Sequence, residues 1–116
     1  MLYNLTQGKM IIENVKTLND IGQKNQGLMF KKKQKDTALF FYYEKPEYPL
    51  IHMLFVFHAI DIIYINNNFT VVGIKENILP FTPLVFPPRL ARHFFELPGN
   101  SLKNINIKIG DEMALF

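Results

Sequence analysis

The stretch from Leu50 to Ile65 reads LIHMLFVFHAIDIIYI, and it decides how the rest of the chain is interpreted. It is almost wholly apolar, yet it contains His52, His58 and Asp61. A carboxylate in such surroundings is costly unless it is paired or hydrogen-bonded. Asp61 therefore needs a partner, and the identity of that partner is the first question the sequence raises.

Two interpretations of Asp61 stay open. In the first, its carboxylate contacts a ligand or acts as a general base at the end of an apolar strand. In the second, it accepts hydrogen bonds from loop N–H groups, or pairs with Arg89 or Arg92, and fixes the chain at the entry to a hairpin. Buried carboxylates are usually satisfied in this second way.

The quoted stretch predicts one strand followed by a hairpin. Leu50–Phe57 is apolar at both sets of alternating positions, which is typical of a central strand covered on two faces. Ile60–Ile65, the turn Asn66–Asn68 and the segment Phe69–Lys75 predict a β-hairpin. Asparagine tolerates the positive φ that tight hairpin turns require.

Outward from this stretch, short apolar segments alternate with turn residues, as in all-β domains. Further strands are expected at Leu2–Leu5, Met10–Val15, Thr37–Tyr43, Arg92–Leu97, Ile105–Ile109 and Glu112–Phe116. Short helical pieces are expected at Ile21–Gln26 and Ser101–Asn104. The sequence therefore predicts a mainly β fold, a small barrel-like single domain over residues 1–116 with one or two short helices.

The segment Leu79–Leu90 contains Pro80, Pro83, Pro87 and Pro88. Proline removes hydrogen-bond donors from a sheet, so this segment is predicted to be an ordered loop. Long loops of this kind serve either as binding loops and lids or as stiff covers over one end of a sheet.

Composition limits the class of protein. The chain has 116 residues, of which 48% are hydrophobic and 20% charged, as expected for one globular domain. It has no cysteine, which excludes disulfides, thiolate nucleophiles and cysteine-ligated metals. The apolar run is too short to span a bilayer and the N-terminus lacks signal-peptide features. We therefore expect a cytoplasmic protein without a membrane partner.

The charge balance is mildly basic, with a formal net charge of +3. The basic patch consists of Lys31, Lys32, Lys33 and Lys35. Such a block is typical of a solvated turn, and weak binding of phosphate or nucleic acid is the alternative. Because the excess is small and no aromatic residue is interleaved, nucleic acid is not expected as the main partner.

No catalytic constellation can be recognised in the sequence. His52, His58 and His93 do not have metal-ligand spacing, so no metal site is predicted. Ser101 is the only serine and no G-x-S-x-G motif surrounds it. Glycine loops that cradle phosphates are absent as well, so no cofactor is predicted.

Six segments in a fixed order carry a resemblance to a known family. They are GLMF at 27–30 followed by Lys31, ALFFYY at 38–43, HM at 52–53, IDIIYI at 60–65, FELPGNS at 95–101 and KIGDEM at 108–113. In this order the chain resembles the widespread prokaryotic family called domain of unknown function 192. The resemblance implies a compact, mainly β domain and no established activity.

The chain departs from the family pattern near the histidines. His52 stands where the pattern has Trp, Phe55-Val56 where it has Asn-Thr, and Ala59 where it has Pro, while Met53 and Asp61 keep the pattern. The resemblance therefore implies that any pocket beside Asp61 is more apolar here than in relatives.

The leading hypothesis for function is a non-catalytic module that binds an unknown small molecule or protein. Its site is expected near Asp61, lined by His52, Arg92 and Phe81, with the loop 79–90 as rim. One alternative is a hydrolase-type enzyme that uses Asp61 with His52 or His58 as acid and base. Another is a weak nucleic-acid or phosphate binder that uses Lys31–Lys35 with Arg89 and Arg92.

Overall fold

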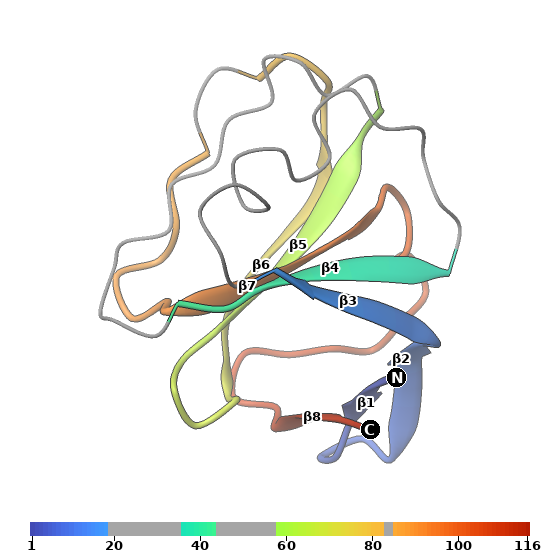
Figure 1. Ribbon diagram of the computed structural model, residues 1–116, viewed down its shortest axis with the longest axis vertical. Helices are drawn as coiled ribbons and strands as arrows, with labels where there is room; N and C mark the ends of the chain where they lie inside the picture. Colours follow the sequence, from blue (N-terminus) through green and yellow to red (C-terminus); the bar gives the residue numbers. More distant parts are fainter. Residues whose placement is uncertain (19–35, 44–57, 83–84) are drawn as a thin grey trace.

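The computed structural model describes residues 1–18, 36–43, 58–82 and 85–116. Within these ranges the chain forms eight β-strands and no helix, arranged in two sheets (Figure 1). The strands are β1 (Leu2–Asn4), β2 (Lys9–Ile12), β3 (Asn14–Leu18), β4 (Thr37–Phe41), β5 (Ile60–Ile65), β6 (Val71–Ile78), β7 (His93–Pro98) and β8 (Met113–Leu115). The prediction of a mainly β domain is confirmed.

The larger sheet has five strands in the order β3-β4-β7-β5-β6. Strands β3 and β4 run parallel, and the other neighbours are antiparallel. The predicted hairpin is confirmed as β5 and β6, with Ile63 opposite Ile74. Its turn uses Asn66, whose side-chain Oδ1 accepts the N–H groups of Asn68 and Thr70 at 2.9 and 3.1 Å.

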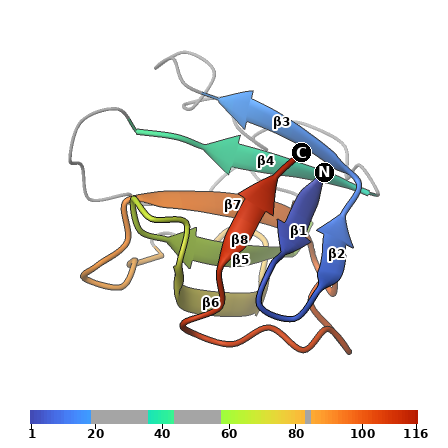
Figure 2. The same ribbon diagram turned by 90° about the horizontal axis from the view of Figure 1, so that it is seen from below.

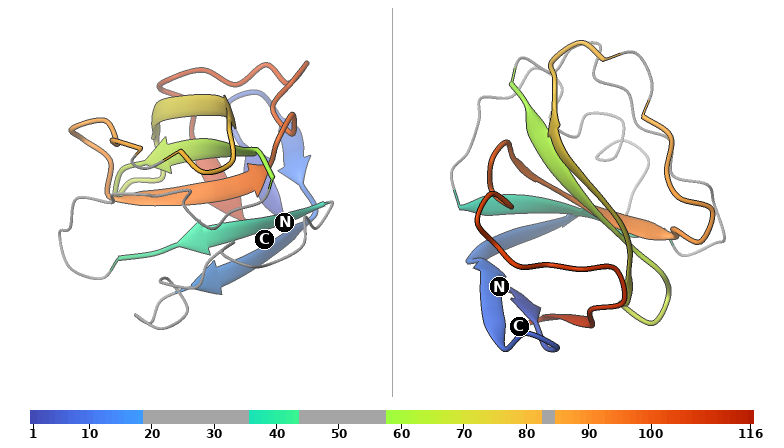
Figure 3. Two further views of the ribbon diagram at one scale, coloured as in Figure 1. Left: turned by 90° about the horizontal axis from the view of Figure 1, so that it is seen from above. Right: turned by 180° about the vertical axis from the view of Figure 1, so that it is seen from behind.

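The smaller sheet has three strands in the order β2-β1-β8 and contains both chain termini (Figure 3). The amino group of Met1 donates to the carbonyl of Phe116 at 2.8 Å. The strands expected at Leu2–Leu5 and Glu112–Phe116 are both confirmed by this sheet, in which β1 pairs with β2 and with β8. Seen from below, the smaller sheet lies across one face of the larger one (Figure 2).

Two apolar clusters fill the two faces of the larger sheet. The first lies between the sheets and joins Leu2, Ile12 and Met113 of the smaller sheet to Phe40 and Phe95 of the larger one. The second lies on the opposite face. Its members are Leu18, Leu39, Phe41, Ile60, Ile62, Tyr64, Val85, Ala91 and Phe94. Strand β7 is thus covered on both sides because its alternate residues enter different clusters.

Four expectations about the fold are changed. The strand expected at Met10–Val15 is divided at Glu13 between β2 and β3, which belong to different sheets. The barrel is not confirmed, because the described strands form two separate sheets. The outer strands are β3 and β6 in the larger sheet and β2 and β8 in the smaller one. The strand expected at Ile105–Ile109 is wrong: N–H groups of Ile105 and Ile107 bond to carbonyls only three and two residues earlier, which turns the backbone. The helical piece expected at Ser101–Asn104 is likewise a series of turns.

The expected strand Leu50–Phe57 and the helix Ile21–Gln26 lie outside the described residues. The loop that follows β6 contains no strand or helix in its described parts, 79–82 and 85–90. Val85 and Ala91 anchor it in the second cluster. Among the described residues, no helix has the length and apolar character needed to cross a membrane.

The loop after β6 packs so closely on that strand that Gly73 is required there. A Cβ at this position would overlap the Cγ of Pro88. We predict that Gly73→Ala lowers the free energy of unfolding by about 1–3 kcal/mol, the usual cost of overpacking. Urea denaturation measures this change. In a Pro88→Ala background the same substitution should cost clearly less, and equal costs in both backgrounds would contradict the packing argument.

Candidate functional site

Asp61 lies in β5 with its side chain fully buried, and three backbone N–H groups donate to its carboxylate. Its Oδ1 accepts from Asn77 at 2.7 Å and from Asn100 at 3.3 Å. Its Oδ2 accepts from Leu102 at 2.8 Å. Hydrogen bonds to a carboxylate are stronger than neutral ones and offset the cost of burial.

The donors belong to two different parts of the chain. Asn77 lies in β6 at an irregularity of the β5–β6 pairing, where Ile60 opposes Ile78 and Ile62 opposes Lys75. Asn100 and Leu102 lie in the turns that follow β7. The carboxylate therefore ties β5 to both of its neighbours, which is the second of the two interpretations that the sequence left open.

The segment after β7, Pro98–Ser101, is a tight turn with little freedom. The N–H of Ser101 donates to the Pro98 carbonyl at 3.1 Å, and Asn100 takes a positive φ of 69°. Asparagine is one of the residues that accept this conformation in turns. Gly99 is required beside it, because a Cβ there would come within 2.9 Å of the Ala59 carbonyl oxygen.

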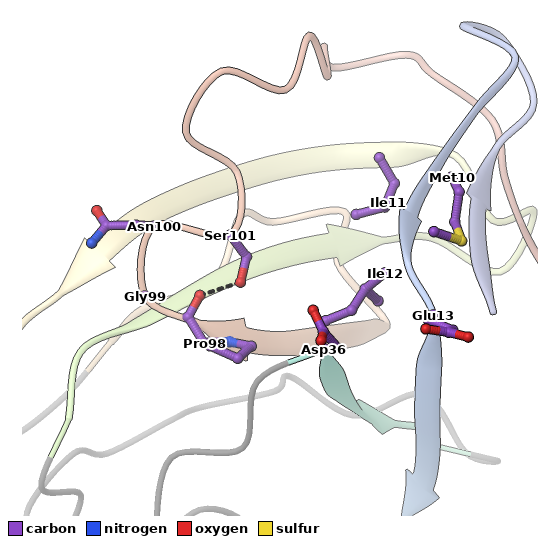
Figure 4. A pocket seen from close by; sticks show the side chains of 9 residues that line it. All are labelled: Met10, Ile11, Ile12, Glu13, Asp36, Pro98, Gly99, Asn100 and Ser101. Atoms are coloured by element: carbon purple, nitrogen blue, oxygen red, sulfur yellow. Dashed lines mark hydrogen bonds between the residues drawn. The ribbon is translucent and has the colours of Figure 1, made fainter.

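This turn forms one wall of a pocket of about 380 Å³. Figure 4 shows the turn and the segment Met10–Glu13 as the main lining elements, together with Asp36. The described residues that line it are Met10, Ile11, Ile12, Glu13, Asp36, Pro98, Gly99, Asn100 and Ser101. Asp36 is held in place because its carbonyl accepts the N–H of Asn14 at 3.0 Å. The volume is that of a site for a small molecule.

The other residues expected to line a site do not gather around Asp61. Arg92 bonds through its N–H to the carbonyl of Ile65, at the far end of β5, four residues or about 13 Å from Asp61. Its guanidinium donates to the carbonyl of Ala91. Phe81 lies in the turn after β6, is 51% exposed and does not line the pocket. His52 and the patch Lys31–Lys35 lie outside the described residues.

Of the two described histidines, His93 connects separate parts of the chain, whereas the printed contact of His58 is to its neighbour Ala59. His93 Nδ1 accepts the N–H of Tyr43 at 3.0 Å, and its Nε2 lies 2.9 Å from Oδ1 of Asn67. This pattern assigns the ring proton to Nε2. His58 Nδ1 lies 3.2 Å from the Ala59 carbonyl. Among the described His, Asp and Glu residues, no group of three is placed to hold a metal ion.

Glu96 is a buried carboxyl group whose environment the sequence did not single out. It lies in the middle of β7, between Leu39 and Ile62 of the neighbouring strands, and only 6% of it is exposed. Burial raises the pKa of Glu96 to about 8. No donor to this carboxyl is found in the described part of the chain, so the neutral form is favoured at neutral pH.

The amino-acid sequence matches a known sequence family over almost the whole chain. Residues 4–115 match the profile of DUF192, described as an uncharacterized ACR family. The chain belongs to the DUF192 family. This confirms the resemblance carried by the six segments, two of which, IDIIYI and FELPGNS, contain Asp61 and the turn that it holds.

Proteins similar to this DUF192 domain are found among both sequences and solved structures. A UPF0127 protein of Pyrococcus furiosus is 28% identical over 112 residues, covering 97% of this chain and 95% of its own. A protein of unknown function from Novosphingobium aromaticivorans has a similar structure, with a TM-score of 0.86, 19% identity, and coverage of 98% and 82%. A candidate transcription regulator from Sinorhizobium meliloti has a TM-score of 0.83, 21% identity, and coverage of 97% and 88%. At these identities the two structural likenesses concern the fold alone.

The sequence did not reveal the pocket of this DUF192 domain. Glu13, Asp36 and the turn Pro98–Ser101 come from three distant parts of the chain, and none forms a motif by itself. The one available signal was the FELPGNS segment, whose glycine and asparagine mark a turn that requires special backbone conformations.

We predict that Asp61→Asn lowers the free energy of unfolding by about 2–4 kcal/mol, because one amide oxygen cannot accept three N–H groups. Urea denaturation followed by circular dichroism measures this loss. Asp36→Asn is the matched control: its side chain is exposed, and a change within about 0.5 kcal/mol is expected. An equally small effect for Asp61→Asn would contradict the structural role of its carboxylate.

The pKa of Glu96 makes stability depend on pH. Because the folded-state pKa of about 8 lies above the ordinary value of 4.5, the folded protein holds one extra proton between these values. The free energy of unfolding should therefore fall as pH rises across this window, by up to about 1.4 kcal/mol per pH unit, and level off above it. Urea denaturation at a series of pH values measures this slope.

Glu96→Gln should remove that contribution to the slope, since its amide does not titrate. Glu112→Gln, on an exposed carboxyl, is the control that should keep the wild-type slope. Identical pH profiles for the wild type and Glu96→Gln would show that burial does not perturb this carboxyl.

Proposed function

We propose that the protein is a non-catalytic binding module for a small molecule, and that the molecule occupies the pocket beside the turn Pro98–Ser101. The observation that carries this proposal is the pocket itself, about 380 Å³ in volume, with apolar and polar walls. Most small-molecule sites are concave, largely apolar and contain a few fixed polar groups. Ile11, Ile12 and Pro98 supply the apolar surface here.

The pocket wall is rigid, which supports a binding role. The carboxylate of Asp61 accepts the backbone N–H groups of Asn100 and Leu102. Gly99 donates its N–H to the Ala59 carbonyl at 3.0 Å. A site that is already in its bound conformation loses less entropy when a ligand enters. In this proposal Asp61 is a positioning residue that acts on the ligand through the turn.

The hydrolase alternative receives less support from the geometry. Both carboxylate oxygens of Asp61 already accept backbone N–H groups, and no described histidine is among its hydrogen-bond partners. A general base has to reach the proton that it removes, directly or through one water molecule. His52 lies outside the described residues, so its pairing with Asp61 stays a prediction.

The nucleic-acid alternative rests on Lys31–Lys35, which also lie outside the described residues. It stays a prediction that a salt-dependence measurement can test, because phosphate contacts weaken steeply as salt is raised. The expectation that the loop 79–90 forms the rim of the site also stays a prediction. None of its described residues lines this pocket.

A thermal-shift screen of small metabolites tests the proposal, since a ligand that binds only the folded state raises the melting temperature. We expect hits for the wild type that are lost in Met10→Trp, where a larger side chain fills part of the pocket. Leu5→Trp is the matched control, because Leu5 and Met10 are each 49% exposed and only Met10 lines the pocket.

The control should keep every hit that Met10→Trp loses. Hits that bind both variants equally would place the ligand elsewhere and overturn the proposal. A complete absence of hits for the wild type across chemically diverse metabolites would also argue against a small-molecule module.

A further inference from the structure

The backbone N–H groups of the turn Pro98–Ser101 already have partners, so the side-chain amide of Asn100 is the donor that the turn retains. In the turn, the N–H of Gly99 donates to the Ala59 carbonyl, that of Asn100 to Asp61 and that of Ser101 to the Pro98 carbonyl. The hydroxyl of Ser101 also donates to the Pro98 carbonyl, at 2.5 Å. Its own oxygen is left as an acceptor facing the pocket (Figure 4).

Among the described residues, the two ionisable side chains that line the pocket are both acidic. Glu13 lies between β2 and β3, and Asp36 lies directly before β4. No described residue donates a hydrogen bond to either side-chain carboxylate or forms an ion pair with it. Two acidic residues line one pocket although the chain carries a net charge of +3. Neighbouring charges of one sign repel each other, so this placement contributes nothing favourable to the fold.

In the described lining, these two observations favour a cation over an anion as the ligand. An anion requires N–H donors or cations, and the turn has already used its backbone N–H groups. A protonated amine has the opposite needs: it donates up to three hydrogen bonds and gains from nearby carboxylates. The apolar surface of Met10, Ile11, Ile12 and Pro98 suits an alkyl or aromatic portion attached to that amine.

We propose that this pocket binds a small organic cation, namely an ammonium group carried on an apolar chain. The inference rests on the proposed function and adds the chemical class of the ligand. The ammonium group is held between the carboxylates of Glu13 and Asp36, and the apolar portion lies against Ile12 and Pro98. Because both carboxylates are exposed, the attraction is moderate and sensitive to salt.

Three probes of equal chain length test the ligand class: hexylammonium, 1-hexanol and hexanoate. Isothermal titration calorimetry at low ionic strength should detect hexylammonium binding at millimolar concentration, weaker binding of 1-hexanol and none of hexanoate. Raising the salt to about 0.3 M should weaken hexylammonium binding and leave 1-hexanol unchanged.

The variant that tests the carboxylates is Glu13→Gln with Asp36→Asn. Asparagine is chosen because Asp36 has a φ of 60°, which asparagine also tolerates. This double variant should weaken hexylammonium binding about tenfold, as expected for the loss of two exposed ion pairs. The control, Glu76→Gln with Glu112→Gln, removes the same amount of charge from exposed sites away from the pocket and should change the affinity less than twofold.

The outcomes separate the two proposals. If 1-hexanol binds as well as hexylammonium, or if the Glu13 and Asp36 variant has no effect, the cation preference is overturned while a small-molecule site remains. Failure of hexylammonium to bind at all also overturns the ligand class. The proposed function is then tested separately by the thermal-shift screen: it is supported if Met10→Trp removes the metabolite hits and overturned if it does not.

Discussion

The fold depends on one carboxylate that cannot be left without donors. Asp61 lies in β5, where all the remaining residues are hydrophobic and buried. Its charge would therefore be very unfavourable without hydrogen-bond partners. Three backbone N–H groups from β6 and from the turns after β7 remove this cost. Those N–H groups would themselves lack partners, since one belongs to a pairing irregularity and two to turns. The carboxylate and the three N–H groups therefore each require the other as a hydrogen-bond partner. These hydrogen bonds fix the positions of β6 and of the turns after β7 relative to β5.

Other buried polar groups repeat this arrangement on a smaller scale. Asp111 accepts from the side chain of Asn4 and from the N–H of Lys108, and the hydrogen bond from Asn4 holds its pKa below the ordinary value against the effect of burial. His93 joins the end of β4 to the β5–β6 turn. In each case a side chain satisfies backbone groups in a loop that a sheet ladder cannot reach. Glu96 differs, because in the described part of the chain it has no donor and takes up a proton instead.

Features set by neighbouring residues could be predicted from the sequence, and features set by distant contacts could not. The β5–β6 hairpin follows from alternating apolar residues around Asn66, and the structural interpretation of Asp61 follows from its apolar surroundings. The alternation of Ile105, Ile107 and Ile109 led to a wrong strand prediction, because periodicity does not show whether a partner strand is available. Turns form in this segment instead of a strand. The expected strand Met10–Val15 is divided at Glu13, where the chain passes from the smaller sheet to the larger. No local pattern marks that change of sheet.

That change of sheet is also what creates the pocket. At Glu13 the chain leaves one sheet for the other, and the parallel pairing of β3 with β4 brings Asp36 beside Asn14. The turn Pro98–Ser101 closes the opposite side because Asp61 and Ala59 hold its N–H groups. The same hydrogen bonds that hold the turn in place also use its backbone N–H donors, so the stability of the wall and the scarcity of backbone donors in the pocket have one cause. A ligand preference for donors and positive charge thus follows from how the fold satisfies its own backbone, and substitutions at Asp61 should alter both properties together.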